Sequence, residues 1–103
     1  MTRDVPIDPY VTDVLMRDLV GHDRAPSAFL VYLWLWRMSR GEGRERIGAS
    51  LQTIATQTGL SKSAVQVAVR HLARRRLLTA ARATPTAAPV YAVHEPWRGR
   101  PSP

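Results

Sequence analysis

Residues 61–75 carry polar and basic side chains at spacings that bring them to one side of a helix. Arginine and lysine donate to guanine, glutamine pairs with adenine, and valine can contact the methyl group of thymine. We expect Arg70 to form a two-pronged bond to guanine and Gln66 to adenine, with Arg74 later on the helix contacting phosphate. The expected contact residues of this helix are Ser61, Lys62, Ser63, Gln66, Val67, Arg70 and Arg74.

The apolar residues of the same stretch define the helix that presents these side chains. Val65, Ala68, Val69 and Leu72 recur at intervals of three and four, which is typical of one buried helix face. The contact residues then point away from the core. Ser61 is the expected N-cap, because its side-chain oxygen can accept from a free amide of the first turn.

A shorter helix is expected directly before this one. Leu51, Ile54 and Ala55 fall on one face, and Ser50 is a suitable N-cap. Gly59 can end that helix in a left-handed conformation that other residues adopt at a cost. Two helices joined by a short turn with glycine form the helix-turn-helix pattern, which we place at residues 50–76.

The stretch LQTIATQTGLSKSAVQVAVRHLARRR, residues 51–76, resembles the helix-turn-helix of bacterial repressors. The similarity rests on small Ala55 where the helices cross, Gly59 in the turn and β-branched Val65. It extends loosely over residues 77–93, as in winged-helix regulators of the MarR and GntR type. Such proteins often have glycine just after the second helix, where this chain has Arg76 followed by Leu77. The resemblance implies transcriptional regulation, most simply repression by occlusion of a promoter.

The pattern of residues 77–94 predicts a β-hairpin, which would be the wing of a winged helix. Two short strand candidates, 77–82 and 89–94, flank a hairpin loop at 83–88, and Ile47 is expected in a strand that pairs with them. Because the loop has no Lys or Arg, Arg82 at its base is the expected phosphate contact. The expected fold is mainly α: a trihelical winged helix-turn-helix with a small β-hairpin wing and an extra N-terminal helix, spanning residues 9–94.

Two further helices are expected before the motif. Asp8 and Pro9 form a good opening for a helix over 9–20, which Gly21 can close. Residues 26–39 are apolar nearly all the way round, which indicates burial on all sides. We expect a homodimer built from both helices, with an intramolecular core as the alternative. The expected interface residues are Val14, Leu15, Leu30, Trp34, Leu35 and Met38.

Both ends of the chain are expected to lie outside the domain. Residues 1–8 resemble a flexible arm, and residues 95–103, rich in proline, are expected to be disordered. Within this tail, Arg98-Gly-Arg100-Pro resembles the core of an AT-hook, whose arginines enter a narrow minor groove.

The charge is concentrated in one half of the sequence. Residues 1–50 carry seven Arg and seven Asp or Glu, whereas residues 51–103 carry eight Lys or Arg and the single acid Glu95. The net charge of +7 therefore coincides with the predicted helix-turn-helix, as expected of a nucleic-acid binder. The alternative is a merely solvated basic face.

Other functions find little support in the sequence. There is no cysteine, and His22, His71 and His94 lack the spacing of a metal site, so we expect no metal and no cofactor. No nucleophile, phosphate-loop or paired-carboxylate motif indicates an enzyme. Neither a signal peptide nor a membrane span is apparent, so we expect a single cytoplasmic domain.

The sequence favours sequence-dependent binding of double-stranded DNA through residues 61–75, by a dimeric transcriptional regulator. A role in replication or plasmid maintenance would use the same fold. A different class of function is protein interaction, with the apolar helix 26–39 docking on a partner. No sequence feature identifies a small-molecule effector.

Overall fold

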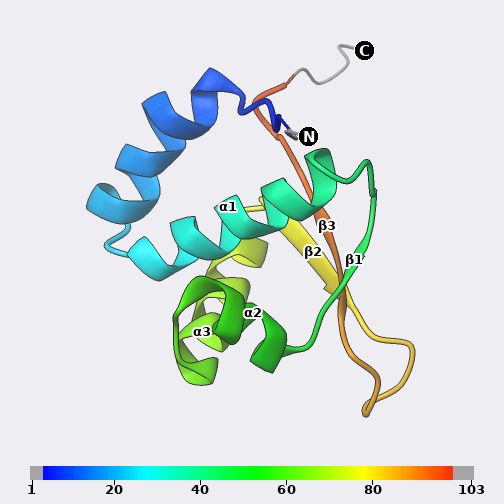
Figure 1. Ribbon diagram of the computed structural model, residues 1–103. Coiled ribbons are helices and arrows are strands. Elements are labelled where there is room, and N and C mark those ends of the chain that lie inside the picture. Colours follow the sequence, from blue (N-terminus) through cyan, green and yellow to red (C-terminus); the bar gives the residue numbers. More distant parts are fainter. Residues whose placement is uncertain (1–3, 99–103) are drawn as a thin grey trace.

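The computed structural model describes residues 4–98. These residues are mainly helical, with a small three-stranded antiparallel sheet (Figure 1). After an N-terminal helical segment, the elements are α1 (Pro26–Arg40), β1 (Ile47–Gly48), α2 (Leu51–Thr58), α3 (Lys62–Arg74), β2 (Leu78–Ala81) and β3 (Val90–Val93).

The N-terminal segment forms wide, π-helical turns over Val11–Leu15 and Arg17–His22. Its hydrogen bonds reach five residues back, as in the 2.7 Å bond from the Asp23 amide to the carbonyl of Asp18. The Asp8 carboxylate accepts from the amide of Tyr10 at 2.9 Å, so the helix opens where the sequence indicated. It ends at His22 instead of residue 20, because this ladder of hydrogen bonds continues past Gly21.

Helix α1 lies at the centre of the molecule, with the N-terminal segment on one side and α2 and α3 on the other (Figure 1). Tyr32 and Leu35 are fully buried on it, and Leu15 of the N-terminal segment is buried against the same core. Leu15 and Leu35 therefore do not face a second subunit, contrary to expectation, because the chain itself encloses them. Of the other expected interface residues, Leu30 is 44% exposed, and three are half-buried: Val14, Trp34 and Met38.

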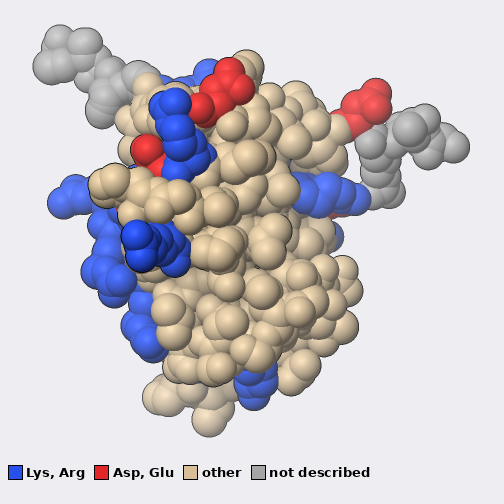
Figure 2. Space-filling view, turned by 90° about the vertical axis from the view of Figure 1, so that its left-hand side faces the viewer, with Lys and Arg blue, Asp and Glu red and all other residues tan. Residues whose placement is uncertain are grey.

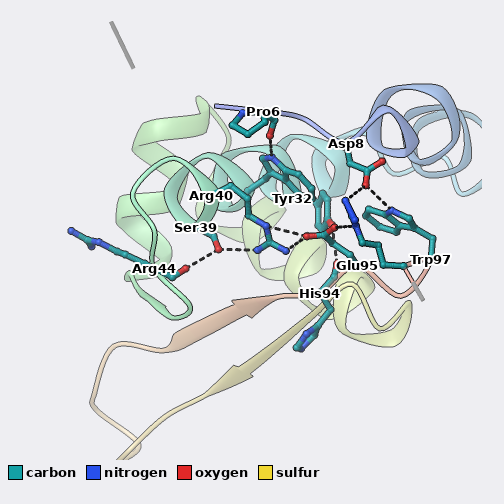
Figure 3. A network of polar contacts seen from close by, with 11 residues as sticks. Pro6, Asp8, Tyr32, Ser39, Arg40, Arg44, His94, Glu95 and Trp97 are labelled. Atoms are coloured by element: carbon teal, nitrogen blue, oxygen red, sulfur yellow. Dashed lines mark hydrogen bonds and ion pairs between the residues drawn. The ribbon is translucent and has the colours of Figure 1, made fainter. Parts of the chain in front are cut away.

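The two ends of the described chain pack together, which corrects the expected free arm and disordered tail. The Trp36 indole donates to the carbonyl of Pro6 at 2.9 Å. The ring of Trp97 stacks on that of Tyr10 with centroids 4.5 Å apart. The indole nitrogen of Trp97 donates to Asp8 (Figure 3). Residues 4–8 and 95–98 thus belong to the folded body.

The sheet has the strand order β1-β3-β2. Ile47 pairs with Tyr91, which confirms that the short strand before α2 joins the sheet of the C-terminal hairpin. In β3, Tyr91 and Val93 are buried whereas Val90 is half-buried, in line with the alternation in the sequence. The β2–β3 hairpin projects beyond the helices in Figure 1.

Helix α3 ends in a left-handed residue that is not glycine. Arg76 has φ +61°, and the amide of Leu77 donates back to the carbonyl of Leu72 at 2.9 Å. This is the hydrogen-bonding pattern of a Schellman end, in which a side chain at the left-handed position costs free energy.

We expect Arg76→Gly to raise the free energy of unfolding by about 0.5–1 kcal/mol, because glycine adopts positive φ without the clash at Cβ. Urea titration of both proteins measures the change. Ala73→Gly is the control: Ala73 is an exposed residue in the last turn of α3, where the backbone is helical, so glycine there should destabilise. A loss of stability in Arg76→Gly as well would contradict this account of the helix end.

Candidate nucleic-acid interface

Local capping fixes α2 and α3 around their turn. The Ser50 hydroxyl accepts from the amide of Thr53 at 3.0 Å, and the Ser61 hydroxyl accepts from the amide of Ala64 at 3.1 Å. Gly59 ends α2 with φ +79°. Both N-caps and the left-handed glycine confirm the sequence analysis, and they determine where α3 begins.

Helix α3 separates its two faces sharply. Val65, Ala68 and Leu72 are buried against the core, while Val69 is half-buried. Val67 stands out on the opposite side with 55% of its surface exposed. All the contact residues expected on and before this helix are exposed: Ser61, Lys62, Ser63, Gln66, Val67, Arg70 and Arg74.

Hollows flank the exposed face of α3 on both sides. On one side, α3 and the hairpin enclose a groove of about 260 Å³, which we call the wing groove. On the other, the start of α1 and α3 enclose an apolar hollow of about 370 Å³ that Val67 and His71 help to line. The residues lining the wing groove are Leu51, Gln66, Val69, Arg70, Ala80, Ala81, Arg82, Pro89 and Tyr91.

Three cations gather around the wing groove. Arg70 and Arg82 line it from opposite sides, and Arg82 also lines an adjoining hollow with Lys62. The Arg82 guanidinium donates to the carbonyl of Pro85 at 3.2 Å, which holds it against the hairpin. The structure therefore brings Arg82 together with the contact residues of α3, as an interface for a polyanion requires.

Acidic and basic groups are distributed unevenly over the surface (Figure 2). Lysine and arginine side chains follow one edge of this view, and the visible acidic side chains lie in its upper part, at the height of the N-terminal segment in Figure 1. The lower part, at the height of α2 and α3, shows no acidic group.

A cluster of ion pairs and hydrogen bonds around Asp23 holds the end of α3 to the N-terminal segment. Asp23 pairs with His71 at 2.8 Å and lies 3.4 Å from the Arg75 guanidinium. His22 donates a further hydrogen bond at 2.9 Å. Arg75 is thus engaged within the protein, and His71 is half-buried beside it.

This cluster makes stability depend on pH. The hydrogen bond from His22, followed by those from His71 and the charge of Arg75, lowers the pKa of Asp23 below its usual 3.8, against the effect of burial. Because the unfolded chain then binds the proton more tightly, the contribution of Asp23 is complete above about pH 5 and is lost as the pH falls from about 4 through the lowered pKa of the folded state.

We expect Asp23→Asn to flatten this part of the acid transition, measured as Tm between about pH 5 and pH 3. Exposed Asp13 provides the control, since Asp13→Asn removes the same charge outside the cluster. An Asp23→Asn protein with the wild-type slope would contradict the assignment.

Arg98 lies away from this surface. Arg98 pairs with Asp8 at 2.9 Å and with Glu95 at 2.7 Å, at the end of the molecule opposite the hairpin (Figures 1 and 3). Its guanidinium is engaged by these two carboxylates while the side chain stays 62% exposed, so the minor-groove contact of Arg98 stays a prediction. Arg100 lies outside the described residues.

Sequence reasoning gave no functional role to Tyr91, which lines the wing groove although only 1% of it is exposed. The only available signal was that Tyr91 lies on the side of its strand that faces the core of the protein. Within residues 4–98, no three His, Cys, Asp or Glu side chains are grouped as metal ligands. None of the helices in that part is long and apolar enough to cross a bilayer.

Comparison with known proteins identifies one family. A family model described as a helix-turn-helix domain matches residues 25–78, which span α1, α2 and α3. No curated protein and no solved structure matches the chain.

Proposed function

We propose that this chain, which belongs to the helix-turn-helix domain family through residues 25–78, binds double-stranded DNA in a sequence-dependent way. The observation that carries the proposal is the exposed face of α3, where base-reading side chains stand clear of the core. In this proposal α1, α2 and α3 form the trihelical unit of a winged helix, and the β2–β3 hairpin is its wing.

Each side chain on this face has a proposed role. Arg70 pairs with guanine, Gln66 with adenine, and Val67 contacts a thymine methyl group. Residues at the helix start reach the groove floor most directly, which gives Ser61, Lys62 and Ser63 a place in reading. Outside this central set, phosphate contacts fall to Arg74 and Arg82.

The proposed biological role is transcriptional regulation, most simply repression, by a cytoplasmic regulator similar to the MarR and GntR types. Promoter occlusion needs no domain beyond the one that binds DNA. A dimer would use the outer side of α1, where Leu30 is 44% exposed and Trp34 is half-buried. Replication or plasmid maintenance would use the same contacts with DNA.

A second candidate function rests on the same outer side of α1. Leu30 leaves apolar surface open on α1, which would suit docking on another protein. In that case Arg70→Ala would leave function intact, whereas a polar residue at Leu30 would abolish it.

Selection from a random pool of duplexes tests the main proposal. We expect an enriched sequence, and an affinity for it that falls steeply between two salt concentrations as phosphate counterions are released. A palindrome would support the dimer, because half-site spacing mirrors the symmetry of the protein. If no duplex sequence were enriched and the affinity for duplexes did not change with salt concentration, the proposed DNA binding would be refuted.

A further inference from the structure

The hydroxyl group of Tyr91 is a polar atom on a buried side chain that lines the wing groove. Among residues 4–98 it has no hydrogen-bond partner, although the side chain is 1% exposed. Every fully buried side-chain nitrogen or oxygen in this part of the chain does have a partner. The hydroxyl is therefore not sealed in the core, and the opening available to it is the groove that Tyr91 lines.

The surroundings of this hydroxyl select an anion. Arg70 and Arg82 line the same groove, and none of the residues that line it carries a carboxylate. The groove continues into the hollow that reaches Lys62, since the two share Leu51, Arg82 and Pro89. Cations thus line a track that runs between α3 and the hairpin.

We propose that one phosphodiester strand of the bound duplex lies in the wing groove and that Tyr91 Oη donates a hydrogen bond to one of its phosphate oxygens. This inference rests on the proposed binding of DNA and adds a contact from the floor of the groove. When α3 enters the major groove of the duplex, the adjacent sugar-phosphate backbone must pass along one side of the helix. The wing groove is the side that Arg70 and Arg82 line.

A phosphate contact made by a neutral donor has a distinct signature. The Tyr91 hydroxyl releases no counterion and reads no base, so its loss should weaken every duplex alike without changing the dependence on salt. Removing Arg82, the proposed phosphate contact of the same groove, should instead reduce the salt slope by about one.

The test compares Tyr91→Phe with the wild type on preferred and random duplexes. We expect roughly tenfold weaker binding to both, with the salt slope, the base preference and Tm unchanged. Arg82→Gln should lower the salt slope. Tyr10→Phe is the matched control, because Tyr10 stacks on Trp97 at the far end of the molecule.

Single neutral methylphosphonate linkages then locate the phosphate. At one linkage the loss of affinity should be smaller in Tyr91→Phe than in the wild type, because the hydrogen bond from Tyr91 is already absent and only the contribution of the phosphate charge remains to be lost. Wild-type affinity in Tyr91→Phe, altered preference at one base pair, or a lowered Tm would each overturn the proposal while leaving DNA binding intact. A wild-type protein that binds no duplex would instead refute the proposed function.

Discussion

Arg70→Ala should weaken binding to the preferred duplex by about 1–3 kcal/mol and relax the preference at a single base pair. Arg70 is exposed near the middle of α3, on the face opposite Val65 and Leu72, and its guanidinium is free of ion pairs within residues 4–98. A two-pronged bond to guanine loses both hydrogen bonds at once in the variant. Titration of a set of duplexes that differ by one base pair measures both effects.

Two arginine variants separate base reading from charge. Arg74→Ala should weaken all duplexes about equally and reduce the salt slope by about one, as expected of a phosphate contact. Arg46→Ala removes the same charge from an exposed position in the loop before β1 and should change little. If Arg70→Ala lowered the affinity for every duplex by the same factor, Arg70 would be a phosphate contact and the proposed reading face would be wrong.

The helix-turn-helix was predictable because its determinants are local. Ser50, Gly59 and Ser61 each act within three or four residues of their own position, through a cap or a left-handed turn. The buried spacing of Val65, Ala68 and Leu72 then fixes which side of α3 faces outward. Sequence spacing therefore recovered the exposed face of the candidate site without any knowledge of the tertiary structure.

The packed ends of the chain were not predictable by the same reasoning. Residues 95–98 looked disordered because proline and glycine surround them, yet Trp97 bonds to Asp8 from 89 positions away. Such contacts depend on the path of the whole chain. The wing groove also depends on long-range packing. Tyr91 and Arg70 line the same groove only after the hairpin has folded beside α3, and no local sequence pattern encodes this arrangement.

The largest change in stability should come from Glu95, a residue that the sequence analysis assigned to the tail. Its carboxylate accepts from the Arg40 guanidinium, which also lies over the ring of Trp36 at 4.7 Å from the centroid (Figure 3). The two side chains are only 27% and 17% exposed. Arg40 thus reaches across 55 positions of sequence to bind the C-terminal segment to α1.

We expect Glu95→Ala to lower the free energy of unfolding by about 2–3 kcal/mol in urea titration of the full chain, because it leaves the Arg40 charge in a partly dry site. This expected loss of unfolding free energy is smaller than the cost of breaking a fully buried ion pair, since water still reaches both side chains. Glu45→Ala, at an exposed position, is the control for the loss of one acidic charge.

The double variant Arg40→Met, Glu95→Leu decides whether the stranded charge causes the loss. Replacing both partners by apolar side chains of similar size should recover much of the stability lost in Glu95→Ala, because no unpaired charge remains. Equal stability of the single and double variants would instead place the loss in the packing of residues 95–98, and the ion pair would have no special part in holding the ends of the chain together.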